Sequence, residues 1–508
     1  MNNFPDEVDV AGEGSFPASD APPWTLGVER PNGRLERDSM GEVRVPADAL
    51  YGAQTQRAVE NFRISDYRFQ RNFIQVIGLI KACAARANGE LGVLPADLSA
   101  TIAEVADRIA NGMYFEQFVV DVFQTGSGTS TNMNANEVIA RLSTAHPNDD
   151  VNCSQSSNDV IPSAIHIAAA LAMRDELLPS MEFLRERLEE KTLEFWDVFK
   201  IGRTHLQDAT PMRLGEEFSG YGHQVKASAE RLLVAMEGLL ELPLGGTAIG
   251  TGVNAPAGFA ARTIALIAER TGLRFREARN HFEAQAAKDA VLFLSGALKT
   301  YAVALTKIAN DIRWLGSGPR GGLGEIRVAA LQPGSSIMPG KVNPVVPESV
   351  LMVCAQIIGH DAAMTWACAA GNFELNAMMP LIAFNLLDSI SLLATSSRNF
   401  GALCIAQLSA NGDEAAALIE QSLAMATFLV PAIGYDRAAV IAKEAYESGR
   451  NIREVAIEKS GLSATKIAEL FELLGNSDRA QPKRAVGSNP FHAGVTVDQP
   501  HKRRRGSE

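Results

Sequence analysis

The chain has 508 residues, of which 46% are hydrophobic and 6% aromatic, and its formal net charge at pH 7 is −12. This length suits two to four domains or one large helical assembly, and the hydrophobic fraction is sufficient for a sizeable core. The acidic balance excludes nucleic acid as the main partner, because phosphate binding requires a basic face.

Cysteine usage and the N-terminus indicate the compartment. The five cysteines are scattered, odd in number and without C-x-x-C spacing, which fits a reducing compartment and gives neither a disulfide framework nor a zinc site. The N-terminus is acidic, unlike a secretory signal or a transit peptide. No uninterrupted apolar run has the length needed to span a membrane. We therefore predict a cytoplasmic protein without a membrane segment.

The N-terminal part of the chain begins with a segment that lacks periodicity. Residues 1–31 are polar and punctuated by Pro and Gly, so we predict a disordered tail. Residues 32–153 are expected to form a mixed, mostly helical domain, with a β-like piece at Gly41–Val45 and helical patterns at about 69–92 and 97–112.

Long helices dominate the middle of the chain, and we expect residues 154–412 to form a central bundle domain. Several of these helices exceed the usual globular length, and their apolar surface is more than one chain can easily cover, which points to oligomer packing. The expected helices span about 159–199, 212–240, 282–314, 344–370 and 376–405.

A small helical domain is expected over residues 413–475. Its short helices are predicted at about 412–425, 437–448 and 463–472. Residues 476–508 turn polar again and are predicted to form a second disordered tail, whose basic tip is interpreted as solvated.

The polar loop 334–344 carries the densest group of reactive side chains. It combines Ser335, Ser336, Lys341 and Asn343 with two glycines, and Asn343 followed by Pro344 is typical of an N-cap and a first helical position. Unpaired N–H groups at a helix N-terminus, together with a lysine, make an anion site.

Three more polar loops have the same character, at 126–134, 154–159 and 202–211. The first is expected to enter a helix near Asn136, the second to be capped by Ser157 or Asn158, and the third to open a helix at Thr210–Pro211. One such loop could simply be a good cap. Four of them, all without metal-ligand spacing, predict neutral donors that converge on a small polyanion such as a dicarboxylate.

His205 is the histidine best suited to acid–base chemistry. It lies in a polar loop, and the unperturbed pKa of histidine lies near working pH, although a satisfied structural histidine would look the same. Glu348 falls in the first turn after Pro344, where a carboxylate interacts favourably with the helix dipole. It could also orient His205 and raise its basicity.

The string GSSIMPGKVNP at 334–344 resembles the signature of the fumarase/aspartase superfamily, helical lyases that form fumarate by anti elimination. Other stretches resemble the class II, iron-independent fumarase branch: GSGTSTNMNANE at 126–137, HPNDDVN at 146–152, SQSSND at 154–159, GRTHLQDATP at 202–211, GGTAIGTG at 245–252 and GNFELN at 371–376. His205 and Gly340 favour that branch, because aspartases carry Gln and Ala at these positions.

The resemblance implies a mainly α fold, with a three-domain subunit whose long central bundle assembles into a tetrameric helix core. It implies the reversible anti hydration of fumarate to (S)-malate in the tricarboxylic acid cycle, without a metal or an organic cofactor. The expected partners are fumarate, L-malate and three further copies of the chain, with each active site built from three subunits.

The family's roles can be carried over position by position. Ser335 would be the base that removes the C3 proton of malate, while Lys341 and Asn343 would stabilise the aci-carboxylate. His205, polarised by Glu348, would act on the water or hydroxyl at C2. The other residues expected to hold the carboxylates are Ser127, Gly128, Thr129, Ser156, Ser157, Asn158, Thr204, Ser336 and Val342.

A second, non-catalytic dicarboxylate site of the family is resembled by His146, Pro147, Asn148 and Asp149. The segment just upstream, Arg141 to Ala145, is shorter than in many relatives and lacks the basic residue expected near Ser143.

Two alternatives stand beside the hydratase reading. The first is an ammonia-lyase acting on aspartate. Residue 205 distinguishes it, because His at this position favours elimination of water over elimination of ammonia. A catalytically silent helical scaffold is distinguished by intact Ser335, Lys341, His205 and Glu348, because nothing structural requires that combination.

Overall fold

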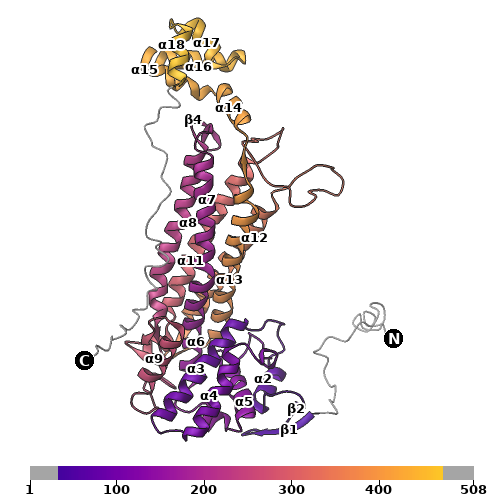
Figure 1. The fold of residues 1–508 in the computed structure, drawn as a ribbon, viewed down its shortest axis with the longest axis vertical. Helices are drawn as coiled ribbons and strands as arrows, with labels where there is room; N and C mark the ends of the chain where they lie inside the picture. Colours follow the sequence, from indigo (N-terminus) through magenta and orange to yellow (C-terminus); the bar gives the residue numbers. More distant parts are fainter. Residues whose placement is uncertain (1–32, 473–508) are drawn as a thin grey trace, which may run out of the picture.

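The computed structural model describes residues 33–472, so the predictions for 1–31 and 476–508 lie outside the described residues. A long helical bundle carries a compact helical region at one end and a small helical module at the other (Figure 1). Within the described residues every sheet has two strands. The predicted mainly α fold is confirmed.

The compact region at the start of the chain contains a hairpin followed by helices. Strand β1 (Gly33–Asp38) pairs antiparallel with β2 (Gly41–Pro46), so the predicted β-like piece is half of a hairpin whose first strand the sequence reading missed. The helices that follow are α2 (Ala53–Asn61), α3 (Arg71–Glu90), α4 (Ala96–Ala110) and α5 (Thr129–Ser143).

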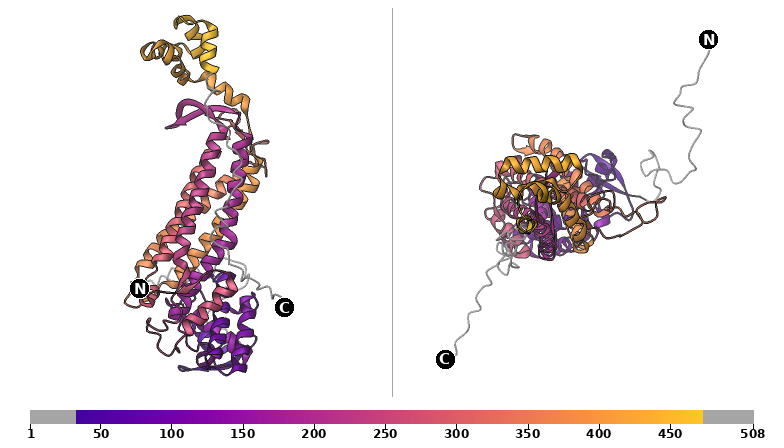
Figure 2. Two further views of the ribbon diagram at one scale, coloured as in Figure 1. Left: turned by 60° about the vertical axis from the view of Figure 1, so that its left-hand side comes forward. Right: turned by 90° about the horizontal axis from the view of Figure 1, so that it is seen from above.

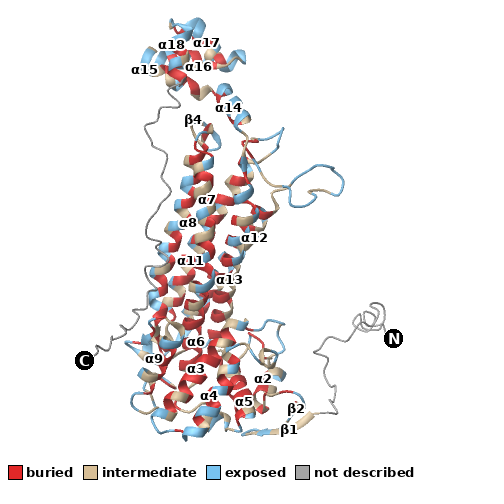
Figure 3. Ribbon diagram, in the orientation of Figure 1, coloured by how far each residue is buried: buried red, intermediate tan, exposed pale blue. Residues whose placement is uncertain are grey.

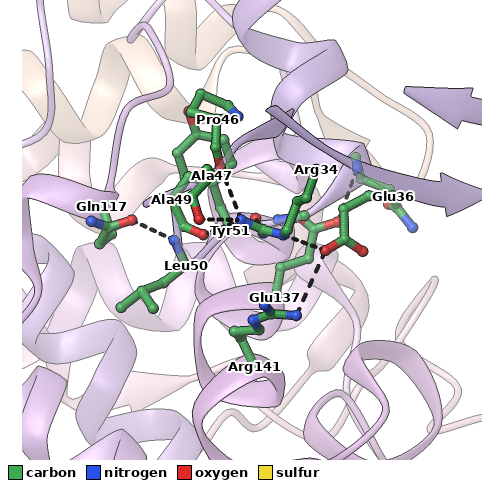
Figure 4. Close-up of polar contacts among 12 residues, drawn as sticks. Arg34, Glu36, Pro46, Ala47, Ala49, Leu50, Tyr51, Gln117, Glu137 and Arg141 are labelled. Atoms are coloured by element: carbon green, nitrogen blue, oxygen red, sulfur yellow. Dashed lines mark hydrogen bonds and ion pairs between the residues drawn. The ribbon is translucent and has the colours of Figure 1, made fainter. Parts of the chain in front are cut away.

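Charged side chains fix this hairpin to the helices (Figure 4). The Arg34 guanidinium pairs with Glu36 and donates to carbonyl oxygens along the following loop, and Glu36 also pairs with Arg141 of α5 at 3.8 Å. The Glu137 carboxylate accepts the backbone N–H groups of Gly52, Gln54 and Thr55. A carboxylate at this place satisfies the free N–H groups at the start of α2.

The central bundle begins with one long rod. It consists of α6 (Ser157–Ala172), a π-helical turn η3 (Met173–Leu177) and α7 (Leu178–Glu194). The sequence predicted one helix over 159–199. The π turn interrupts it just before Pro179, whose ring has no N–H to donate to the helix.

The rod packs against α8 (Leu214–Met236) and α13 (Met379–Leu403). Helices α11 (Asp289–Leu315) and α12 (Val345–Ala369) complete the bundle by packing on α8, on α13 and on each other. Buried residues follow the interior of this bundle along most of its length (Figure 3). The helix predicted at 282–314 is broken into α10 (His281–Ala286) and α11. At the break, the buried Lys288 ammonium donates to the carbonyl oxygens of Ala284, Gln285 and Ala287.

The remaining short elements connect the long ones. They are β3 (Phe199–Thr204), β4 (Gln207–Arg213), β5 (Glu241–Leu242), α9 (Phe259–Thr271), β6 (Arg276–Glu277), β7 (Ile326–Arg327), β8 (Gly371–Asn372), β9 (Leu375–Asn376) and β10 (Ser409–Ala410). Strand β7 pairs antiparallel with β10, which joins the chain after α11 to the chain after α13.

The C-terminal module has its own apolar core. Its helices are α14 (Gly412–Gln421), α15 (Val430–Ile433), α16 (Tyr435–Ser448), α17 (Ile452–Lys459) and α18 (Ala464–Glu472). The buried apolar residues of this module form a separate cluster, which also includes Ile201 of β3. The main apolar core is made of buried residues between Val45 and Leu408 in the sequence. Seen from above, the module lies over the end of the bundle (Figure 2). The domain boundaries themselves stay a prediction.

Three helices of the described part are long and apolar enough, by length and composition alone, to cross a membrane. None of the three is the uninterrupted apolar run that the sequence was predicted to lack; they meet the criterion because mean hydropathy tolerates scattered polar residues. Only 44% of the apolar window in α11 and 39% of that in α12 is buried. The bundle therefore presents apolar surface that one chain leaves uncovered.

Candidate active site

Ser335 lies in the connection between β7 and α12, which projects sideways near the upper end of the bundle and is largely exposed (Figure 3). Residues 330–335 and 338–342 line a cavity of about 550 Å³. The Ser335 hydroxyl oxygen accepts the backbone N–H groups of Ile337 (3.2 Å) and Met338 (3.1 Å). Two donors aimed at one oxygen would stabilise negative charge on it.

The loop is closed on itself at Gly334. The N–H of Gly334 donates to the carbonyl of Lys341 at 3.0 Å, and a Cβ on Gly334 would lie 2.2 Å from that oxygen. The Asn343 amide donates to the Gly334 carbonyl at 2.6 Å. Asn343 is therefore not the predicted helix cap: it clamps the loop, and α12 begins at Val345 without a side-chain cap.

His205 lies in the turn of the β3–β4 hairpin, and its side chain is exposed. His205 and Leu206 both have φ of +58°, as a two-residue type I′ turn requires. This left-handed conformation is unusual for Leu. The sequence predicted a helix opening at Thr210–Pro211, whereas the chain stays in strand β4 and α8 begins at Leu214.

A row of three hydroxyls joins the starts of α5 and α6. Thr129 Oγ1 lies 2.6 Å from Ser127 Oγ and 2.7 Å from Ser157 Oγ. Helix α5 begins at Thr129, earlier than the predicted Asn136, after Gly128 takes a φ of +72°. The cap of α6 is Ser156 rather than Ser157 or Asn158, because Ser156 and Asp159 form a capping box.

Two more of the motifs lie against this row. The Asn158 amide donates to the carbonyl of Ala248 at 2.8 Å, and the buried Asp159 accepts the N–H groups of Gly245 and Thr247. The backbone of Gly126 touches that of Ala377, just after the 371–376 motif, so closely that a Cβ would lie 1.8 Å from its carbonyl oxygen. Four motifs thus meet in one place. The motif 146–152 joins them through Asn152, whose Oδ1 accepts the amides of Asn132 and Asn136.

The other two motifs, 202–211 and 334–344, are far from that place. The rod from Ser157 to Glu194 leads from the hydroxyl row to the β3–β4 hairpin, and at 1.5 Å per residue it spans roughly 55 Å. Figure 1 shows α5 and α6 in the lower part of the molecule and β4 at the upper end of the bundle, below the C-terminal module. Among the described residues, no hydrogen bond or ion pair joins His205 to Glu348.

Comparison with known proteins gives a consistent result. A family model described as "Lyase" matches residues 41–359, and one described as "Fumarase C C-terminus" matches residues 425–474. A fumarate hydratase class II of Mycobacterium tuberculosis (strain CDC 1551 / Oshkosh) is 53% identical over 434 residues, which cover 84% of this chain and 92% of the relative. The chain belongs to the class II fumarate hydratases.

Further relatives of this hydratase family agree with that assignment. A fumarate hydratase class II of Thermosynechococcus vestitus is 49% identical and covers 85% of this chain and 95% of its own length. A crystal structure of the class II fumarase from Schistosoma mansoni aligns with a TM-score of 0.85 and 38% identity, covering 88% of this chain and 99% of that chain. The resemblance stated from the motifs is confirmed, and the chain is a hydro-lyase by family.

Behind the hydroxyl row lies a buried lysine that none of the motifs includes. Lys81 of α3 is fully buried and donates to Asn152 Oδ1 at 3.0 Å, and the amides of Asn132 and Asn136 donate to the same oxygen. Burial lowers the pKa of Lys81 to about 7, against an opposing effect of Asp159. Lys81 is the one charged residue in the apolar run Val76–Ala85, which was the available signal in the sequence.

The predicted second anion site lies on a π-helical turn, Pro147–Val151. His146 Nδ1 lies 3.0 Å from the N–H of Asp149 and 3.0 Å from its carboxylate. Asn148 is exposed beside them. These contacts are within the turn itself, and the second site stays a prediction for the hydratase.

Proposed function

We propose that this chain catalyses the reversible anti hydration of fumarate to (S)-malate, as a cytoplasmic enzyme of the tricarboxylic acid cycle. The observation that carries the proposal is the Ser335 hydroxyl, whose oxygen accepts two backbone N–H groups in the loop that also holds Lys341. Serine is a weak base, and donors fixed in this way favour its alkoxide.

In the dehydration direction, the Ser335 alkoxide takes the C3 proton of malate, and the electron pair moves into the adjacent carboxylate to give the aci form. Lys341 is proposed to stabilise that developing charge, where fixed donors contribute most. The Asn343 amide keeps one N–H for the same role while the other clamps the loop at Gly334. The C2–O bond then breaks, and the departing hydroxide takes a proton from His205 and leaves as water. Glu348, which forms no bond to His205 within one described chain, is proposed to orient His205 in the assembled enzyme.

The carboxylates of the substrate are held by neutral donors. The hydroxyl row of Ser127, Thr129 and Ser157, with the neighbouring Asn158, receives one end of the dicarboxylate. The other proposed contacts are Gly128, Ser156, Thr204, Ser336 and Val342. All steps of this mechanism use groups of the polypeptide alone.

The active enzyme is proposed to be a homotetramer with each active site shared by three subunits. The hydroxyl row and the β3–β4 hairpin lie roughly 55 Å apart in one chain, whereas a small dicarboxylate must touch both. Large exposed apolar side chains on two bundle helices support the assembly. They are Phe293, Val303 and Trp314 of α11 and Met352, Ile358 and Trp366 of α12.

The test follows fumarate by its ultraviolet absorbance when purified protein is given L-malate and, separately, L-aspartate, without added metal. We expect absorbance to rise with malate only. A rise with aspartate alone would move the chain to the ammonia-lyases, and no rise with either substrate from an intact tetramer would favour the silent scaffold.

A further inference from the structure

A buried carboxylate at the upper end of the bundle has no role in the chemistry proposed above. Glu325 is 0% exposed and lies just before β7, ten residues before Ser335 in the chain. Arg203 Nη1 donates to both of its carboxylate oxygens at 3.0 Å. Lys200 Nζ lies 3.5 Å from the same carboxylate and 3.1 Å from Glu217 of α8.

The two cations come from the hairpin that carries His205. Lys200 and Arg203 are both in β3, and Arg203 precedes His205 by two residues. The strand pairing shifts register between Ile201 and Arg203, and the last two residues of the strand, Arg203 and Thr204, pair again with Asp208 and Gln207. The Arg203–Glu325 contact adds a constraint from outside the hairpin at this irregular position, next to the turn.

The backbone around Glu325 is fixed from the opposite side. Its carbonyl accepts the N–H of Asn411 at 2.8 Å, and the Asn411 amide donates to the carbonyl of Gly324 at 2.9 Å. The following strand, β7, pairs with β10. Glu325 therefore joins three segments that are distant in the sequence: the hairpin, the root of the Ser335 loop and the start of the C-terminal module.

We propose that Glu325 is a positioning residue, which holds the His205 hairpin and the root of the Ser335 loop in one fixed geometry. This inference rests on the proposed function, because that function gives His205 and Ser335 their roles. Glu325 itself is covered by Arg203 and Lys200 and does not contact substrate. Its effect on the reaction is exerted through the placement of the two reacting segments.

Loss of the Glu325 charge should move the hairpin because the charges that it pairs with are buried. Lys200 is 2% exposed at its side chain and Arg203 15%, so removing the carboxylate leaves one cation without a charged partner near the hairpin turn. The hairpin then shifts to bring that cation toward water. A displacement of about 1 Å at a reacting group is sufficient to lower a rate by up to about 10²-fold.

The test measures kcat and KM for malate with Glu325→Gln, which keeps the shape of the side chain and removes its charge. We expect kcat to fall by about 10-fold to 10²-fold, with a smaller change in KM, because the hydroxyl row at the other end is unaffected. Arg203→Lys, which keeps the charge but cannot reach both oxygens in the same geometry, should lower kcat in the same direction. The double variant should be no worse than the more affected single variant.

Asp107→Asn is the matched control. Asp107 pairs with Arg86 and Arg270 between α3, α4 and α9, at the other end of the molecule. The substitution Asp107→Asn should lower thermal stability and leave kcat unchanged. A fall in kcat as large as that of Glu325→Gln would therefore overturn the inference. A kcat within about twofold of the parent for Glu325→Gln would also overturn it. If Glu325→Gln does not fold, the same limit on kcat is applied to Arg203→Lys. An inactive parent protein would instead refute the proposed function.

Discussion

The buried ammonium of Lys81, behind the hydroxyl row, allows a quantitative test of how burial affects the stability of this end of the molecule. Lys81 is buried in α3 with Asn152 as its hydrogen-bond partner, and burial lowers its pKa from 10.5 to about 7. That difference corresponds to about 5 kcal/mol of folding free energy. Lys81→Met removes the buried charge and also removes one charged hydrogen bond, which is worth about 1.5–3 kcal/mol.

The sign of the pH dependence follows from the lowered pKa of Lys81. Between pH 7 and 10.5 the unfolded chain holds a proton that the folded chain has released, so this group makes stability rise with pH in that window. Below pH 7 both states are protonated and the full penalty of the buried charge is present. Lys81→Met should therefore stabilise the protein by about 2–4 kcal/mol at pH 6, and the gain should shrink as the pH approaches 10.

Denaturant unfolding at pH 6, 7, 8, 9 and 10, at one fixed protomer concentration, measures this difference. Lys191→Met is the control, because the Lys191 ammonium is buried but pairs with Glu194 and the carbonyl of Leu408. Lys191→Met should lower the free energy of unfolding at every pH from 6 to 10. A stability gain for Lys81→Met that is constant with pH, or that grows toward pH 10, would refute the reasoning.

Three further variants test the proposed roles and the assembly. Ser335→Ala should lower kcat by about 10²-fold or more while the tetramer stays intact in light scattering, and near-normal turnover would exclude Ser335 as the base. Glu348→Gln should reduce kcat more than it raises KM; a change in KM alone would assign Glu348 to binding or capping. Trp366→Lys places a charge where Trp366 is 81% exposed on α12, and should shift the tetramer toward smaller species in sedimentation velocity. An unchanged tetramer would show that this part of α12 faces solvent.

The long helices of this fold were predictable because their apolar residues recur with the helical period. Apolar residues at helical spacing gave α8, α12 and α13 to within a few residues of their observed ends. The β3–β4 hairpin was missed because its strands are short, carry Gly202 and Pro211, and turn at His205–Leu206 without the Asn-Gly or Asp-Gly pair that marks a type I′ turn. The left-handed conformation at Leu206 is imposed by the surrounding structure, and composition alone could not reveal it.

The candidate site was predictable as a set of loops, but the contacts between them were not. Asn343 followed by Pro344 has the composition of a helix start, yet the Asn343 amide bonds to Gly334 across the loop. Glu325 is a single carboxylate in a Gly-rich stretch, and only the folded chain brings it to Arg203. Such pairings depend on tertiary distance, which a one-dimensional pattern does not contain.

The separation of the two half-sites also restricts how the proposed tetramer can be arranged. A subunit placed parallel to its neighbour would put hairpin beside hairpin and hydroxyl row beside hydroxyl row. A two-fold axis perpendicular to the bundle brings the His205 end of one rod to the Ser157 end of another in a closed assembly, because it reverses the direction of the roughly 55 Å rod. Head-to-tail stacking of parallel subunits would also join the two ends, but it would give an open filament instead of a tetramer. The exposed apolar residues of α11 and α12 run from Phe293 to Trp314 and from Met352 to Trp366, so each stripe follows most of a helix, as antiparallel packing of whole bundles requires. In the proposed tetramer, catalysis depends on assembly: a variant that dissociates it should lose turnover even with every proposed catalytic side chain in place.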